Sequence, residues 1–407
     1  MKIVQANKYH FVKGGAERYY LDLSDALAER QHQVIPFAMS HNRNEPSSYD
    51  RYFVPEVDYH GAMGLADKVR AAINTIYSKE TVRRIETLIE TEKPQLIHMH
   101  NIYHQLSPSL ISTAARLGVP LVQTLHDYKL VCPGYLLMTG GKICERCSGK
   151  NYFNAVRYNC LMNSKAASFV GYLEASLHEY LKTYEKIDYF LCPSKFLKRK
   201  IAEFGIDEDK LIHLPYFLPL EEYKPSYDRS DYFIYLGRLS REKGILTLLK
   251  AVKMMQNKRL KCIILGEGPL EAQLKRQIEE WQLENVEFPG YLQGNQLQNL
   301  IRGAAFTVVP SEWYENLPFA VLESFALGTP VVGSKIGGIP EMVLHERSGL
   351  TYTPGNARDL AAALDWMESH PDQAIEMGRE ARKLDEERYA PGPHLERMEE
   401  IYRRVIR

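Results

Sequence analysis

Short apolar runs alternate with longer amphipathic stretches along most of the chain, and this alternation limits the possible folds more than any other feature. Runs typical of β-strands occur at 2–6, 33–37, 96–99, 120–125, 189–192, 232–236, 261–265, 305–309 and 330–333. Stretches with apolar residues at helical spacing include 16–30, 248–256, 270–282, 319–327 and 357–369. Strands that alternate with helices form βαβ units, in which helices cover both faces of a parallel sheet. The sequence therefore predicts an α/β fold.

The alternation starts twice, which indicates two domains in a chain of 407 residues. Residues 218–231 lack apolar periodicity and contain two prolines, as linkers often do. We expect a Rossmann-like domain over 1–217, with a cysteine-containing insertion at about 132–160, a linker over 218–231 and a second Rossmann-like domain over 232–392. Residues 393–407 predict a helix with one apolar stripe that packs back on the N-terminal domain. Because ligands bind beyond the carboxyl ends of such strands, the two doubly wound lobes should face each other across a cleft.

Charge and hydropathy exclude several classes of protein. The chain has 51 Lys and Arg residues against 51 Asp and Glu residues, so it lacks the basic field of a dedicated nucleic-acid-binding protein. Its first residues run into a predicted strand without the long apolar segment of a secretory signal. No window approaches the ~20 uninterrupted apolar residues of a transmembrane helix. We therefore expect a cytoplasmic protein that binds no nucleic acid.

A polar loop between an apolar strand and a helix that begins near Pro318 is the segment most informative about function. Proline suits the first helical turn, and the backbone amides of Asn316 and Leu317 should be exposed at the helix N-terminus, where phosphate binds well. Glu315 precedes the helix, and Glu323 lies about one and a half turns into it. Two carboxylates so placed can accept hydrogen bonds from hydroxyls at two points of one ligand. The alternative is that both only complement the helix dipole.

Glu315 and Glu323 in this setting, followed by 324–332 and by Gly-Gly-Ile-Pro-Glu at 337–341, resemble the donor-site motif of retaining glycosyltransferases of family 4. This is the glycogen-synthase-like family also called glycosyl transferases group 1. The resemblance implies the GT-B architecture, with an acceptor-side N-terminal lobe and a donor-binding C-terminal lobe. It further implies transfer of a hexose from a nucleotide-diphosphate sugar, commonly UDP-glucose or another UDP-hexose, with retention at the anomeric carbon. The acceptor expected is a glycan or lipid-linked saccharide in polysaccharide biosynthesis.

The loop Gly237-Arg238-Leu239-Ser240-Arg241-Glu242-Lys243-Gly244 is the second informative element. Gly237 permits close approach of the backbone, and the guanidinium of Arg238 and the ammonium of Lys243 suit a diphosphate. The alternative is a solvated charged turn. The resemblance implies that both cations stabilise the departing diphosphate, while Glu323 holds ribose hydroxyls and Glu315 positions the sugar. No Asp-x-Asp ends a strand, so we expect metal-independent catalysis that requires no cofactor.

Two further segments of the C-terminal half resemble parts of the family's donor site. Gly266 and Glu267 follow a predicted strand and match the turn that lines the donor. Tyr291 and Leu292 match the strand end whose backbone reads the nucleobase, although an aromatic residue there is often only packing.

The N-terminal half offers fewer candidates. Gly14 and Gly15 match the loop before the first helix, which approaches the donor phosphate or the acceptor; a flexible turn is the alternative. His126 follows a predicted strand and resembles the family's histidine that hydrogen-bonds the donor hexose. His98 and His100 share one face of a strand, but no third ligand is evident, so cleft lining or core packing is favoured over zinc.

Four cysteines lie within one 29-residue span, at Cys132, Cys144, Cys147 and Cys160. In a reducing compartment such clustering indicates metal binding or burial before disulfides. The central C-x2-C is half of a zinc knuckle, and the outer cysteines could complete a tetrahedral thiolate site, although a second C-x2-C is missing. A structural zinc, an Fe–S or redox role, and reduced packing cysteines all remain open.

A basic amphipathic surface is also predicted, with its cations among apolar positions of the segment 62–90. Its basic residues are Lys68, Arg70, Lys79, Arg83 and Arg84. Such a surface can associate peripherally with the inner face of a membrane that carries lipid-linked sugars. A solvated helix face is the alternative.

Two other functions fit the same two lobes. A sugar-nucleotide epimerase of GT-B fold would need no acceptor, and a non-catalytic nucleotide-sugar or glycan-binding module would tolerate loss of the phosphate-binding residues. Because Arg238, Lys243, Glu315 and Glu323 are all present, we expect an enzyme.

Overall fold

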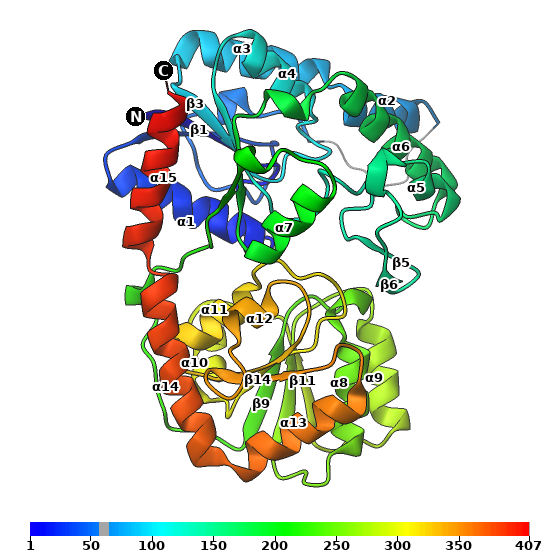
Figure 1. Cartoon of the computed structure of the whole chain (residues 1–407), viewed down its shortest axis with the longest axis vertical. Helices are drawn as coiled ribbons and strands as arrows, with labels where there is room; N and C mark the ends of the chain where they lie inside the picture. The colour runs from blue at the N-terminus through cyan, green and yellow to red at the C-terminus, as the bar shows by residue number, and fades with distance from the viewer. Residues whose placement is uncertain (57–64, 407) are drawn as a thin grey trace.

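The computed structural model describes residues 1–56 and 65–406, with side chains of the second range from 70 onward, and has two six-stranded parallel sheets. The first has the order β2-β1-β3-β4-β7-β8 and the second the order β11-β10-β9-β12-β13-β14. Figure 1 shows one sheet in each of two lobes that lie one above the other. The predicted α/β fold with two doubly wound lobes is confirmed.

The first lobe is built from the N-terminal half of the chain. Its sheet contains β1 (Lys2–Ala6), β2 (Gln33–Phe37), β3 (Leu96–Met99), β4 (Leu121–Thr124), β7 (Tyr189–Cys192) and β8 (Leu211–His213). Its helices are α1 (Gly15–Glu29), α2 (Leu65–Ile76), α3 (Lys79–Glu92), α4 (Ser109–Arg116), α5 (Asn154–Arg157), α6 (Lys165–Tyr180) and α7 (Lys195–Glu203). A small antiparallel hairpin of β5 (Met138–Thr139) and β6 (Lys142–Ile143) stands apart from the main sheet.

The second lobe repeats the architecture. Its sheet contains β9 (Tyr232–Leu236), β10 (Lys261–Leu265), β11 (Val286–Gly290), β12 (Thr307–Val309), β13 (Val331–Ser334) and β14 (Gly349–Tyr352). Its helices are α8 (Ile245–Met254), α9 (Glu271–Glu280), α10 (Gly294–Gly303), α11 (Phe319–Ala326), α12 (Ile339–Met342), α13 (Ala357–Ser369) and α14 (Pro371–Arg388). The central strands are buried on both faces, as parallel strands covered by helices must be.

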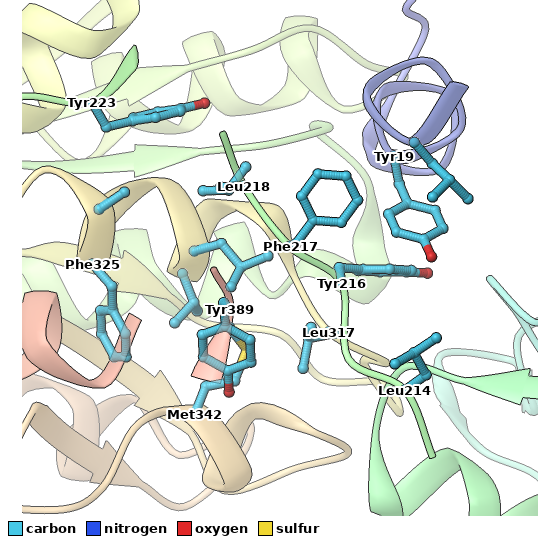
Figure 2. Packing of buried hydrophobic residues seen from close by; sticks show 14 of the residues in the cluster. Tyr19, Leu214, Tyr216, Phe217, Leu218, Tyr223, Leu317, Phe325, Met342 and Tyr389 are labelled. Carbon is cyan, nitrogen blue, oxygen red and sulfur yellow. The ribbon is translucent and has the colours of Figure 1, made fainter. Parts of the chain in front are cut away.

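The segment that connects the two sheets is packed rather than exposed. Figure 2 shows Tyr216, Phe217 and Leu218 between Tyr19 of α1 and side chains of the second lobe such as Leu317. All five residues belong to one buried cluster that draws on both lobes. The range 218–231, expected as a linker, therefore begins inside the hydrophobic core, and apolar burial there opposes free rotation of the lobes.

The last helix, α15 (Pro391–Val405), crosses back to the first lobe, as the red ribbon of Figure 1 shows. The hydroxyl of Tyr402 lies 2.7 Å from His98 Nδ1 at the centre of the first sheet. Tyr19 Oη lies 3.1 Å from His394 Nε2. On the rim, Glu399 pairs with Arg30. The C-terminal end of the chain thus completes the first lobe and ties the two lobes together.

Candidate active site

A buried ion pair lies where the loop after β12 meets the loop after β9. Lys243 Nζ donates to Glu315 Oε1 at 2.6 Å, and Ser311 Oγ donates to the same oxygen at 2.6 Å. The Glu315 side chain is only 6% exposed, and the ammonium of Lys243 also lies over the ring of Trp313, 5.3 Å from its centroid. Burial opposes ionisation of Glu315, but the charge of Lys243 and the two hydrogen bonds outweigh it and lower the pKa of the carboxyl. The carboxylate is therefore ionised, and the cation is held beside it.

Two glycines, Gly337 and Gly338, pack against the backbone of Glu315 and Asn316. Gly338 N donates to Glu315 O at 2.7 Å. Gly337 has a φ of +61°, and a Cβ added there would lie 2.2 Å from that same oxygen. A Cβ at Gly338 would lie 1.8 Å from the carbonyl oxygen of Asn316. The Gly-Gly pair of the sequence motif is thus required by close approach of two backbones.

The N-terminus of α11 presents unpaired amides beside this pair. Within the part of the chain that the structure describes, the amides of Asn316 and Leu317 make no hydrogen bond. The side chain of Asn316 faces away and joins the lobes, since its Nδ2 donates to Leu125 O at 2.9 Å and its Oδ1 accepts from Ser194 Oγ at 3.0 Å. Leu317 is buried in the core shared by the lobes. The backbone N–H groups of these two residues, and not their side chains, are therefore the groups that still lack a partner among the described residues, as amides that bind an anion must.

Arg238 is exposed, and its guanidinium has no hydrogen bond or ion pair to the described residues, so this group is available to a ligand. Its loop is braced by glycines, because Gly237 has a φ of +150° and Gly266 approaches so closely that a Cβ would lie 2.0 Å from Gly237 O. Gly266 N in turn donates to Gly290 O at 2.9 Å. The loops after β9, β10 and β11 therefore form one continuous rim around Arg238.

Three other predicted donor-site residues lie along this rim. Glu267 is exposed beside Gly266. Tyr291 follows β11 with 55% of its surface exposed, so it is not a packing aromatic, whereas Leu292 packs against the core.

Glu323 lies on α11 and meets the first lobe. Arg18 Nη1 on α1 donates to Glu323 Oε1 at 3.2 Å, and Arg18 Nε also pairs with Asp22 at 3.3 Å. Burial raises the pKa of Glu323, although the charge of Arg18 opposes this. Glu323, the residue predicted to bind the ribose, is therefore oriented by a cation from the other lobe. The two residues are 305 positions apart, so the sequence could not indicate this contact.

The two N-terminal glycines also lie at the junction of the lobes. A Cβ at Gly15 would lie 2.7 Å from a ring carbon of Phe319, the first residue of α11. Gly14 is exposed immediately before α1. Only the absence of a side chain at Gly15 lets this loop approach the N-terminus of α11 so closely.

His126 lies at the end of β4, and both of its ring nitrogens are already engaged. Its Nε2 lies 3.0 Å from His100 Nδ1, and its Nδ1 lies 2.6 Å from Tyr216 Oη. Burial lowers the pKa of His126 to about 3, so its ring is neutral at physiological pH. A hydrogen bond to a hexose requires His126 to exchange one of these partners. His98, which bonds Thr124 and Tyr402, lies in the core, in line with the expectation of packing.

Glu341 makes another contact between the lobes that was not predicted from the sequence. Glu341, in the motif after β13, accepts hydrogen bonds from Lys195 N at 2.9 Å and Phe196 N at 2.6 Å. It thereby caps the N-terminus of α7 across the cleft, where a carboxylate is favoured. Its place in the Gly-Gly-Ile-Pro-Glu motif was the available signal, but its partner lies 145 residues away.

Two family models match consecutive parts of the chain. The model described as Glycosyltransferase Family 4 matches residues 13–222, and the model described as Glycosyl transferases group 1 matches 221–384. The D-inositol 3-phosphate glycosyltransferase of Pseudarthrobacter chlorophenolicus is 27% identical over 390 residues, covering 90% of this chain and 85% of that protein. The D-rhamnosyltransferase WbpZ of Pseudomonas aeruginosa is 30% identical over 186 residues, so the chain spans only 48% of its length.

Solved structures agree on the fold. Sucrose-phosphate synthase from Thermosynechococcus elongatus superposes with a TM-score of 0.73 at 18% identity, covering 99% of this chain and 98% of that one. HepE of Anabaena, solved with UDP and glucose, superposes with a TM-score of 0.70 at 16% identity, covering 98% and 99%. The two lobes and the loops between them are those of a GT-B glycosyltransferase. The chain belongs to glycosyltransferase family 4, so the resemblance and the expectation of an enzyme are confirmed.

Among the described residues, no helix is long and apolar enough to cross a membrane.

Proposed function

We propose that the protein transfers a hexose from a UDP-sugar to a glycan or lipid-linked saccharide in polysaccharide biosynthesis, with retention at the anomeric carbon. The observation that carries this proposal is the Lys243–Glu315 pair, held at 2.6 Å beside the free amides that precede α11. A diphosphate there meets the ammonium of Lys243, the exposed guanidinium of Arg238 and two unpaired N–H groups. Fixed donors of this kind stabilise the charge that develops on a leaving group. UDP is the nucleotide proposed for the donor because HepE, which shares the fold, was solved in complex with UDP and glucose.

Each carboxylate has a distinct part in this proposal. Glu323 accepts the ribose hydroxyls while Arg18 holds its orientation from the other lobe. Glu315 keeps Lys243 in place and contacts the hexose, and His126 addresses the hexose from the acceptor side. The acceptor attacks from the face that the nucleoside diphosphate leaves. The charge of the diphosphate is met by Arg238, Lys243 and the amides, so catalysis requires no divalent cation.

A donor panel tests this proposal. We expect UDP-hexoses, and not GDP- or ADP-sugars, to raise the unfolding temperature, because a ligand at 100 times its Kd stabilises the native state by about 2.7 kcal/mol. With a lipid-linked saccharide acceptor, turnover should be unchanged by EDTA, and the anomeric proton coupling of the product should show the configuration of the donor.

Each part of the proposal has a result that contradicts it. If only GDP- or ADP-sugars stabilise the protein, the donor is not a UDP-sugar. A product with the inverted anomeric configuration contradicts retention, and a requirement for Mg²⁺ contradicts metal-independent catalysis. Isomerisation of the donor sugar without any acceptor identifies an epimerase instead.

We further propose that the enzyme works in the cytoplasm, at the inner face of an anionic membrane, through α6. This helix lies at the outer edge of the first lobe (Figure 1), and its polarity is inverted. Its exposed face carries Phe169, Leu173, Leu177 and Tyr180. Its buried face carries Ser168, Gly171, Glu174 and His178. An ordinary surface helix has the opposite arrangement, so the outer face of α6 fits an apolar environment.

The charged residues around α6 favour an anionic lipid surface as the partner of its exposed apolar face. Arg157 and Lys165 are exposed beside the apolar face and form no ion pair within the described residues. The Glu179 carboxylate at the far end of the helix is already neutralised by Lys150. Cations that flank apolar side chains bind anionic lipid.

The basic surface expected over 62–90 supports this docking less well. The side chain of Lys68 lies outside the described residues, and Arg83 and Arg84 both pair with Glu80. Arg70 and Lys79 remain exposed.

The double variant Leu173→Glu/Leu177→Glu is expected to abolish co-sedimentation with vesicles of anionic phospholipid, because it places two charges on the face that enters the lipid. Met254→Glu, on the exposed surface of α8, should bind like the wild type. Binding should also weaken with added salt. Wild-type protein that stays in the supernatant, or a dimer that only the double variant dissociates, contradicts membrane docking.

A further inference from the structure

The insertion between β4 and α6 has little regular structure of its own. It contains only the β5–β6 hairpin, a 3-10 turn at Ser148–Lys150 and the short α5. Six of its non-glycine residues have positive φ angles between 48° and 67°: Tyr135, Leu137, Lys150, Asn159, Met162 and Asn163. Such conformations persist only when their surroundings fix them. Leu130, Val131 and Leu137 pack into the core of the first lobe, but no residue of 138–164 belongs to that core. Short segments without a core of their own are commonly held by metal ions or disulfides.

All four cysteines of the cluster line one small cavity in this insertion, together with Pro133, Gly134, Met138, Asn154, Ala155 and Tyr158. The cavity has a volume of about 10 Å³, close to the space of a single water molecule. Cys132 and Cys147 are buried, and Cys144 and Cys160 are partly buried. Residues from three separate turns of the insertion therefore converge on a space that suits one ion.

Two of the four sulfurs already have a polar neighbour. Cys144 Sγ accepts from Arg146 Nη1 at 3.6 Å, and Cys160 Sγ lies 3.7 Å from Thr139 Oγ1. Within the described residues, no three His, Cys, Asp or Glu side chains stand in a finished metal-binding arrangement. A cysteine sulfur is repositioned by rotation about one bond, so the shared cavity is the feature that argues for a site.

We propose that Cys132, Cys144, Cys147 and Cys160 bind one Zn²⁺ ion as a structural tetrathiolate site. Four cysteines around one position favour tetrahedral zinc, which leaves no open coordination position for catalysis. Binding releases the four thiol protons and leaves the ZnS₄ unit with two negative charges. The guanidinium of Arg146, already at Cys144 Sγ and 4.3 Å from the ring centroid of Tyr158, offsets part of that charge.

The zinc site holds the insertion against the donor lobe. Glu145, between two of the ligands, accepts from Tyr314 Oη at 2.9 Å and pairs with Lys200 Nζ at 2.9 Å. Tyr314 immediately precedes Glu315. At the hairpin, the guanidinium of Arg241 packs so closely on Gly141 that a Cβ there would lie 2.4 Å from it. In Figure 1 the β5–β6 hairpin reaches down toward the second lobe. The metal thus fixes a surface that touches the loops of both Glu315 and Lys243.

Metal analysis of the purified full-length protein tests the site. We expect one zinc per chain by mass spectrometry of the metal. Exchange for Co²⁺ should give the sulfur-to-cobalt charge-transfer band and the intense visible bands of tetrahedral thiolate coordination. Cys144→Ser and Cys147→Ser should lose the metal. Cys192→Ala and Cys262→Ala, buried cysteines outside the cluster, should keep it.

Two further variants keep the test decisive if the serine variants do not fold. Cys160→His, which replaces one zinc ligand by another, should retain the ion, and Glu145→Ala should retain it while losing the contact with Tyr314. Wild-type protein without stoichiometric metal overturns the proposal. Bound iron with visible absorbance, or a mass that shows disulfides, overturns it equally.

Discussion

Alanine in place of Lys243 is expected to lower kcat/KM for sugar transfer by about 10³, or ~4 kcal/mol of transition-state stabilisation. The ammonium is held at 2.6 Å by the buried Glu315 carboxylate and 5.3 Å from the Trp313 ring centroid. It is therefore oriented before the donor arrives, and in the proposed mechanism its charge acts on the departing diphosphate without reorganisation. Alanine removes this charge and leaves the Arg238 guanidinium and the amides before α11 to act alone.

The same substitution also leaves Glu315 buried without its cation. Removing one partner of a buried pair costs about 3–5 kcal/mol, a value that the 26% exposure of the Lys243 side chain reduces. Thermal unfolding must therefore be measured beside kinetics, and UDP affinity by calorimetry beside both. Lys243→Arg keeps a cation and should recover part of the rate.

Lys250→Ala is the matched control, because Lys250 is exposed on the neighbouring helix α8. It should leave both rate and stability unchanged. If Lys243→Ala is folded and transfers sugar within about threefold of the wild-type rate, the proposed role of Lys243 at the diphosphate is wrong.

The fold could be predicted from the sequence because hydrophobic periodicity is a local property. The central strands of the two sheets are short apolar runs, and the predicted helices have their own apolar stripes, so neither depends on distant residues. The edge strands β8, β11 and β14 were not among the predicted runs. The loops of Arg238, Lys243 and Glu315 could be placed for the same reason, since parallel strands bring their carboxyl ends to one edge of a sheet. The confirmed family followed from motifs in these loops.

Contacts between the lobes could not be predicted in this way. Arg18 meets Glu323, Asn316 meets Ser194, and each pair is more than a hundred positions apart with no local pattern to connect its members. The contact of His126 with Tyr216 could not be predicted either, because Tyr216 lies far along the chain, in the segment that connects the two sheets. The linker was predicted to begin at 218 from two prolines and the lack of apolar periodicity, a pattern that does not show the burial of Leu218 and Tyr223.

Gly337→Ala is expected to destabilise the second lobe by several kcal/mol and to lower kcat/KM by about 10². An L-residue at a φ of +61° costs roughly 1–2 kcal/mol before any contact is counted. The new Cβ also overlaps the backbone of Glu315, 2.2 Å from its oxygen and 2.5 Å from its nitrogen. Because backbone atoms cannot rotate away as a side chain can, the Glu315 loop must shift. A displacement of about 1 Å at reacting groups can cost 10²-fold in rate.

Gly355→Ala separates the conformational cost of a positive φ from the cost of the overlap with the Glu315 backbone. Gly355 has a similar φ of +72°, but a Cβ there meets nothing nearer than a side-chain carbon of Glu312 at 3.9 Å. It should lose only the conformational part, roughly 1–2 kcal/mol, and retain full activity. Denaturant unfolding and steady-state kinetics of both variants give the comparison. Equal stability of the two variants, with wild-type activity in Gly337→Ala, means that the Glu315 loop can yield without consequence. The close approach at Gly337 then does not position the Lys243–Glu315 pair.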